Sequence, residues 1–127
     1  FDGWVSADEM ASQLASGQTV LDARSRERYL GAPSPLDPRP GHVPGARSLP
    51  WTEAYREGGV IAPDELAQRT SEATGGKAPA VVYCGSGVTA CSLILALTSA
   101  GAGEARLYPG SWSEWAQDPG RPVEVGP

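Results

Sequence analysis

The sequence predicts a single α/β domain built on a parallel β-sheet with helices on both faces. Short apolar runs of strand length alternate with longer segments of helical periodicity, which is the pattern of a parallel sheet. An apolar run at residues 80–83 leads into a cysteine and a glycine-rich loop, and a long apolar segment follows. The 127 residues have the size of one domain, and no repeat or linker divides residues 1–127.

The first half of the chain carries clear start and stop signals. Ser6 and Glu9 fit a capping box, which predicts a helix that begins after Ser6 and ends at Gly17. The other elements predicted here are a strand at 19–22, a helix at 25–30, a long proline- and glycine-rich loop at 32–45, a brief strand at 46–49 and a weak helix at 52–56.

In the second half, Pro63 predicts a helix start, because proline is favoured in the first turn, and Gly75 marks the end of that helix. The elements predicted after it are a strand at 80–83, a helix at 88–100, a strand at 106–108 and a short helix at 111–116. The tail is rich in proline and glycine and is expected to be loose.

Cys84 is the candidate catalytic residue. It stands at the carboxyl end of a predicted strand, where open α/β sheets bind ligands. Backbone N–H groups of the following loop and helix start would point at its sulfur and favour the thiolate. Glycines allow that loop to curl tightly, which a buried inert cysteine does not need. The anion-stabilising loop is expected to comprise Gly85, Ser86, Gly87, Val88 and Thr89.

Two other residues invite a chemical role. Cys91 could resolve an oxidised Cys84 or form a disulfide, but we expect a small core residue on the inner helix face beside Leu95. His42 could pair with Cys84 as a general base. It lies in a turn sequence, however, and we expect it to tie the turn together by hydrogen bonds.

Asp22 and two tryptophans are expected to be structural. Asp22 ends a strand, and we expect it to accept hydrogen bonds from nearby backbone N–H groups and not to act in catalysis. Trp112 and Trp115 are three residues apart, a spacing that predicts packing of one helix face onto the core.

Composition and charge argue against several classes of protein. A net charge of −5 disfavours general nucleic-acid binding, and no apolar run approaches the roughly 20 residues of a membrane span. Two cysteines and one histidine give neither a disulfide scaffold nor the spacing of a metal site. No dinucleotide fingerprint or Walker loop occurs. We therefore expect no metal, cofactor, nucleic-acid or membrane partner.

The expected location is the cytoplasm, because two cysteines fit a reducing compartment and no signal peptide precedes the first helix. The chain begins at Phe1 and not at methionine, as expected of a processed product or a piece of a longer chain.

A local excess of positive charge lies between residues 24 and 47, in an otherwise acidic chain. This excess favours a small anionic substrate over a polyanion, although a solvated basic face is expected for most of the arginines. The charged residues in this segment are Arg24, Arg26, Arg28, Arg39 and Arg47 against Glu27 and Asp37.

Several motifs, in the correct order over nearly the whole chain, resemble the rhodanese family of sulfurtransferases. The matching segments are residues 20–24, Arg28-Tyr29 with Gly31, residues 41–46, residues 84–90 and residues 110–112. The loop Cys-Gly-Ser-Gly-Val-Thr is similar to that of 3-mercaptopyruvate sulfurtransferases. Thiosulfate sulfurtransferases of similar build usually carry basic residues at the positions of Gly85 and Ser86.

The resemblance implies a three-layer fold with a five-stranded, mainly parallel sheet. It also implies that the Cys84 thiolate takes sulfur from a small anionic donor such as 3-mercaptopyruvate and forms a persulfide. Cyanide, a thiol or thioredoxin would accept the outer sulfur. Arg28 and Arg39 would bind the donor carboxylate, Arg39 at a different spacing from the family arginine, and Ser86 would polarise the leaving thiol or the carbonyl.

Two departures from related proteins matter. Mercaptopyruvate enzymes of the family usually have two rhodanese-like domains, and this chain resembles only the C-terminal one, so an N-terminal rhodanese-like domain is an expected partner. Ala90 stands where related Cys-x5-Arg phosphatases carry arginine, which argues against phosphatase chemistry. Two alternatives stay open, thiosulfate as the donor and a rhodanese-like sulfur-carrier or binding module. Inactive modules commonly lack the cysteine, so Cys84 favours an enzyme.

Overall fold

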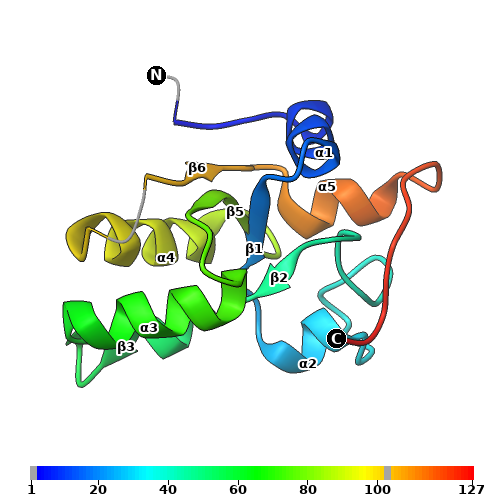
Figure 1. Ribbon diagram of the computed structural model, residues 1–127. Helices are drawn as coiled ribbons and strands as arrows, with labels where there is room; N and C mark the ends of the chain where they lie inside the picture. Colours follow the sequence, from blue (N-terminus) through cyan, green and yellow to red (C-terminus); the bar gives the residue numbers. More distant parts are fainter. Residues whose placement is uncertain (1–2, 102–103) are drawn as a thin grey trace.

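The computed structural model describes residues 3–101 and 104–127, and within them a parallel four-stranded sheet forms the centre of the domain (Figure 1). The strands lie in the order β2 (Arg47–Ser48), β1 (Thr19–Asp22), β5 (Pro79–Tyr83) and β6 (Arg106–Leu107). Asp22 is paired with both Ser48 and Tyr83, so three strands end at the same edge of the sheet. This common edge is the carboxyl end, where Cys84 follows β5.

The expected fifth strand is present only as an isolated bridge. Trp4 pairs in parallel with Leu107, on the outer side of β6. Two hydrogen bonds make this contact, from Val5 N–H to the Leu107 carbonyl and from Leu107 N–H to the Gly3 carbonyl, both 2.8 Å. The predicted α/β class and mainly parallel sheet are thus confirmed, and the strand count of five is wrong by one among the described residues.

The predicted helices form where their end signals place them. The capping box is complete, because the Ser6 hydroxyl accepts from Glu9 N–H at 3.1 Å and the Glu9 carboxylate accepts from Ser6 N–H at 3.0 Å. Gly75 ends the third helix in the left-handed conformation. The helices are α1 (Ala7–Ala15), α2 (Arg26–Leu30), α3 (Pro63–Thr74), α4 (Val88–Ser99) and α5 (Ser111–Gln117).

Two segments differ from their predictions. The weak helix expected at 52–56 is a 3-10 turn, η1 (Trp51–Ala54), followed by a small antiparallel hairpin of β3 (Tyr55–Arg56) and β4 (Gly59–Val60). The tail expected to be loose is tied down. Glu124 and His42 exchange two backbone hydrogen bonds of 2.9 and 2.8 Å, and Gly126 N–H donates to the Leu30 carbonyl. These partners are remote in sequence, so composition alone gave the wrong expectation.

The two faces of the sheet are covered by different helices, which gives three layers (Figure 1). Side chains of β5 alternate between them: Val81 and Tyr83 join α1 and α5 in one apolar core, and Val82 joins α3 and α4 in the other. Cys84 continues the alternation into the second core. The nucleophile candidate is therefore placed by a strand that is buried on both faces.

A buried arginine, Arg24, joins the end of β1 to the long loop that follows α2, because it pairs with Asp22 and with Asp37. Arg24 is only 2% exposed, so it is not one of the arginines that form a solvated face. Its guanidinium donates to both Asp22 oxygens, to the Gly41 carbonyl at 2.6 Å and to Asp37 at 3.4 Å. The guanidinium also lies 4.8 Å from the ring centroid of Trp112.

Replacing Asp22 by Ala is expected to lower the free energy of unfolding by about 3–5 kcal/mol, because it leaves the buried Arg24 charge without its main partner. Urea denaturation measures the loss. Arg26→Ala is the control, since Arg26 is half exposed and its pair with Glu53 is a surface pair, worth at most about 1 kcal/mol. Equal losses in the two variants would contradict the central role of the buried pair.

Candidate active site

Cys84 lies at the centre of the tight loop between β5 and α4. It is 1% exposed, and its Sγ accepts a hydrogen bond of 3.0 Å from Gly87 N–H. The loop needs glycine at position 87, where φ is +93° and a Cβ atom would come within 2.5 Å of the Pro109 carbonyl oxygen. The chain therefore turns around the sulfur, and α4 begins with its first N–H groups at the thiol.

The surroundings of Cys84 favour its ionised form. Burial acts to raise the pKa of the thiol, but hydrogen bonds outweigh burial and the pKa is lowered from its usual value. The donors are the Thr89 hydroxyl and the backbone N–H groups of Ala90, Gly87 and Ser86. A thiolate is the nucleophilic form of cysteine, so the loop activates this residue.

The start of α5 fixes the backbone of Cys84 and Gly85. Cys84 N–H donates to the Ser111 hydroxyl at 3.1 Å, and Trp112 N–H donates to the Cys84 carbonyl at 2.9 Å. Both the N–H and the hydroxyl of Ser113 donate to the Gly85 carbonyl. Ser111 adopts φ of +55°, a conformation uncommon for a residue with a side chain.

Sequence reasoning had not assigned a positioning role to Ser111 or Ser113. The sequence nevertheless indicates this role, because both serines follow β6 within a few residues, and β6 lies beside β5 in the sheet. Polar side chains after neighbouring parallel strands meet at this edge.

Arg28 reaches the Cys84 loop from α2. Its Nη2 lies 2.9 Å from the position that a Cβ on Gly85 would occupy, so the guanidinium rests against the loop backbone. Two of its nitrogens donate to the carboxylate of Asp37, which is otherwise buried. The Arg28 side chain keeps 24% of its surface exposed. A cation is thus available beside the loop, and the buried carboxylate of Asp37 supports it.

Arg39 has a different environment. Its guanidinium donates to three carbonyls, those of Ala116 at 2.8 Å and of Asp118 and Arg121 at 2.9 Å. The Arg39 carbonyl in turn accepts from the Trp112 indole N–H. These contacts tie the long loop to the end of α5.

The expectation for Cys91 is wrong. Cys91 does not pack in the core but lies exposed on α4, and Leu95 beside it is 61% exposed. In the loop itself, the Ser86 side chain is exposed and Val88, the first residue of α4, is 73% exposed. Ser86 is therefore accessible from solution next to the buried thiol.

The structural roles expected for His42 and Asp22 are confirmed. His42 is fully buried, stacks on the ring of Tyr29 at 3.8 Å, and uses both ring nitrogens, one with the Tyr29 carbonyl and one with Glu124. Asp22 accepts Arg24 N–H at 2.9 Å. Trp112 and Trp115 are buried in the core, as predicted.

The described residues contain neither a metal-binding cluster nor a helix able to cross a bilayer. No group of three His, Cys, Asp or Glu side chains among residues 3–101 and 104–127 is arranged to bind a metal ion. Over the same residues, none of the helices combines the length and apolar character that a bilayer crossing requires.

Comparison with known proteins gives consistent matches. The model of the rhodanese-like domain family matches residues 6–118. "Probable 3-mercaptopyruvate sulfurtransferase" of Pseudomonas aeruginosa is 44% identical over 126 residues, 96% of this chain. The 3-mercaptopyruvate sulfurtransferase of Escherichia coli is 41% identical over 110 residues, 83% of this chain. The solved structure of that enzyme from Leishmania major superposes with a TM-score of 0.75 at 33% identity, covering 92% of this chain.

All three relatives are much longer than this chain. The matches cover 44% of the Pseudomonas protein, 38% of the Escherichia protein and 33% of the Leishmania chain. The chain thus spans less than half the length of these relatives.

Replacing Thr89 by Val is expected to raise the pKa of Cys84, because the variant loses the hydroxyl that donates to the thiolate. The pH profile of thiol alkylation should shift to higher pH, measured in a Cys91→Ser background so that only Cys84 reacts. In the parent protein, the lowered pKa of Cys84 also stabilises the folded state at pH values above the pKa of the thiol in the unfolded chain. This stabilisation is lost as the pH falls through the pKa of Cys84 in the folded protein. An unchanged alkylation profile in the Thr89→Val protein would contradict this role.

Proposed function

The chain belongs to the rhodanese family, and from this premise we propose that it is a sulfurtransferase domain that carries sulfur on Cys84. The observation that carries the proposal is the position of the Cys84 sulfur, at the centre of N–H groups that lower its pKa. The donor we propose is 3-mercaptopyruvate, the compound named in the relatives' names.

The proposed reaction has two steps with a covalent intermediate. The Cys84 thiolate attacks the donor sulfur, an S–S bond forms, and the C–S bond breaks with its electron pair leaving as the enolate of pyruvate, which is then protonated. An acceptor nucleophile, cyanide, a thiol or thioredoxin, then takes the outer sulfur and releases the thiolate. The N–H groups of Ser86, Gly87 and Ala90 would stabilise both the thiolate and the persulfide anion.

Two side chains are placed to bind the donor. The Arg28 guanidinium beside Gly85 would pair with the donor carboxylate, a group that its planar fork suits. The exposed Ser86 would donate to the donor's sulfur or to its carbonyl, the oxygen on which the enolate charge develops as the C–S bond breaks. Arg39 holds three carbonyls with its Nε and Nη2 groups, so only its Nη1 group would be left to contribute to donor binding.

Thiosulfate is the second candidate donor, and one observation favours it. Gly85 and Ser86 themselves carry no charge, but Arg28 supplies a cation against the loop that could stabilise a dianion. Asp37 neutralises part of that charge, so we expect a higher kcat/KM for mercaptopyruvate than for thiosulfate. A non-catalytic binding module is less favoured, since such a module has no need of an activated thiol.

We further propose that the chain is the C-terminal catalytic half of a two-domain sulfurtransferase, acting in the cytoplasm. The share of the relatives that it spans supports this arrangement. In such a protein the other rhodanese-like domain would add polar groups to the cleft, so the isolated chain would have lower activity than the longer protein.

Exposure of the protein to mercaptopyruvate is expected to add one sulfur atom, about 32 Da by intact mass spectrometry, which cyanide then removes. Cys84→Ser should not gain the sulfur, because a hydroxyl cannot form a persulfide. Cys91→Ser is the matched control and should gain it as the parent does. The nucleophile assignment is wrong if Cys84→Ser still takes up sulfur while Cys91→Ser does not.

Arg28→Ala is expected to lower kcat/KM for mercaptopyruvate by roughly tenfold to a hundredfold, because a charge-assisted contact to the carboxylate is lost. Arg28→Lys should recover part of the loss. Because the substitution also removes one ion-pair partner of Asp37, the thermal unfolding of each variant is measured to separate a loss of stability from a loss of donor binding. Arg26→Ala, an exposed arginine of the same helix, should retain parental kinetics. Parental kinetics in Arg28→Ala would remove Arg28 from the donor site.

A further inference from the structure

The guanidinium of Arg28 has two edges that can each offer a pair of N–H groups, and Asp37 occupies one of them. Nε donates to Asp37 Oδ2 at 3.0 Å, and Nη2 donates to Asp37 Oδ1 at 2.5 Å. Within residues 3–101 and 104–127, Nη1 has no hydrogen-bond acceptor, and Nη2 has a second N–H group. We call the edge formed by Nη1 and Nη2 the free edge, because it is available to pair with an anion.

The free edge lies against the Cys84 loop. A Cβ atom on Gly85 would be 2.9 Å from Nη2 and 3.7 Å from Nη1 of Arg28. The guanidinium thus occupies the space that a side chain at position 85 would fill. The cation beside the thiol therefore comes from α2 and not from the loop itself, and it brings a partner carboxylate with it.

The carboxylate of Asp37 is buried and shared by two cations. Its side chain is only 2% exposed, and its Oδ2 also accepts from Arg24 Nη1 at 3.4 Å. Arg24 in turn pairs with the buried Asp22. These two arginines and two aspartates have no net charge. An anion on the free edge of Arg28 is therefore attracted by one cation and repelled by Asp37 on the opposite edge of the same guanidinium.

The repulsion from Asp37 depends on the charge of the bound anion. Electrostatic energy scales with the product of the two charges, so a dianion is repelled about twice as strongly, in free energy, as a monoanion at the same place. Mercaptopyruvate carries one planar carboxylate, a group that matches the free edge. Thiosulfate concentrates two charges on a compact group, and Asp37 therefore opposes it more.

We propose that Asp37 is a positioning residue that sets the donor selectivity of the site. It acts through Arg28, because it occupies one edge of the guanidinium, holds the other against Gly85 and keeps the local charge low. The donor class that it selects is a thiol-bearing monocarboxylate, in preference to a dianion. The catalytic meaning of this selectivity rests on the proposed function, but the anion preference itself is measurable without sulfur transfer.

The test uses the Cys84→Ser protein, which cannot take up sulfur. It is titrated with pyruvate, a monoanion, and with thiosulfate, a dianion, at low and matched ionic strength, and the backbone amide signals of Gly85 and Ser86 report binding. Asp37→Asn in this protein is expected to improve the binding of thiosulfate relative to pyruvate by roughly fivefold to tenfold. A loss of order in Arg28 would weaken both anions and largely cancel in the ratio.

The fold of the Asp37→Asn variant is expected to persist, because asparagine has the shape of aspartate and Arg24 keeps Asp22 as its partner. The amide spectrum verifies this. Asp37→Ser removes the same charge with a smaller side chain, and it is the second variant, with the same expected change in the ratio.

A double-mutant cycle separates a role through Arg28 from a general structural role. In the Arg28→Ala background the anions are no longer held beside Asp37, so Asp37→Asn should change the ratio by less than about twofold. An equal change in the presence and absence of the Arg28 guanidinium would overturn the proposed route.

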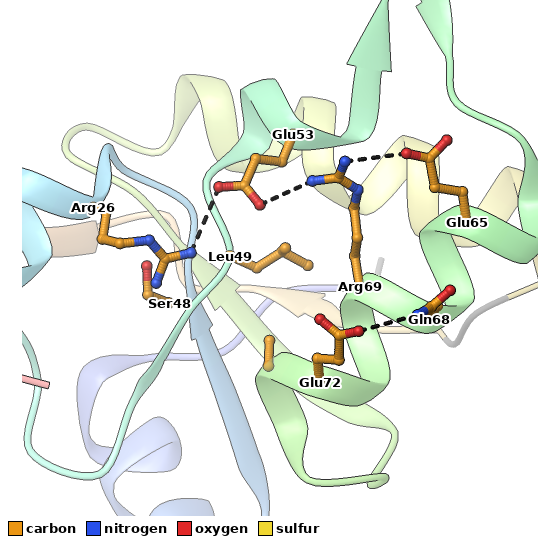
Figure 2. Close-up of a pocket in the computed structure, with 9 residues that line it drawn as sticks. Arg26, Ser48, Leu49, Glu53, Glu65, Gln68, Arg69 and Glu72 are labelled. Atoms are coloured by element: carbon orange, nitrogen blue, oxygen red, sulfur yellow. Dashed lines mark hydrogen bonds and ion pairs between the residues drawn. The ribbon is translucent and has the colours of Figure 1, made fainter.

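Glu53→Gln is the matched control. Like Asp37, Glu53 pairs with two arginines, and Figure 2 shows it between Arg26 and Arg69. The depression that these three side chains line does not include the Cys84 loop. Glu53→Gln also removes one carboxylate charge, and it should leave the ratio of the two anion affinities at the parental value.

With Cys84 restored, Asp37→Asn should raise kcat/KM for thiosulfate relative to mercaptopyruvate by the same factor as in binding. If neither donor transfers sulfur, the proposed function fails, and the binding ratio still decides the role of Asp37. The Asp37 proposal is overturned if neither anion shifts the Gly85 and Ser86 signals, if Asp37→Asn leaves the ratio unchanged, or if Glu53→Gln changes it as much.

Discussion

The rest of the domain depends on the burial of Arg24. A buried guanidinium requires an ion-pair partner for its charge and hydrogen-bond acceptors for its N–H groups. Burial acts to lower its pKa, and the Asp22 carboxylate outweighs burial, so the group stays charged. Its partners come from three places, the end of β1, the loop after α2 and the Trp112 ring of α5. The pairing therefore fixes the long loop against the carboxyl edge of the sheet.

The active-site geometry depends on this fixed loop. Asp37, which Arg24 helps to place, orients Arg28 against Gly85. Trp112, on which Arg24 rests, donates its backbone N–H to the Cys84 carbonyl. The buried charge, the candidate donor-binding arginine and the loop of the thiol thus form one connected set of contacts, in which loss of the central partner is expected to affect both stability and activity.

At the carboxyl edge of the sheet, the ends of parallel strands and a helix start bring N–H groups to one point, which suits a small anion. The start of α5 holds this point in place, because the Ser111 hydroxyl accepts from Cys84 N–H and the Ser113 hydroxyl donates to the Gly85 carbonyl. The Cys84 loop is therefore supported by a helix that follows the neighbouring strand β6.

The sequence by itself determined the features that depend on neighbouring residues. The capping box at Ser6, the proline start of α3 and the glycine turn after Cys84 are local signals, and each produced the predicted element. Tertiary structure decided what local signals cannot carry. The helix α4 is apolar on nearly all sides, so its sequence did not tell which face is buried, and Cys91 was placed on the wrong one. Arg24 and Arg26 are two residues apart and look alike in sequence, yet one is buried and one is exposed. Their difference arises from partners remote in the chain, because the energy of a charged group is set by whatever surrounds it in three dimensions.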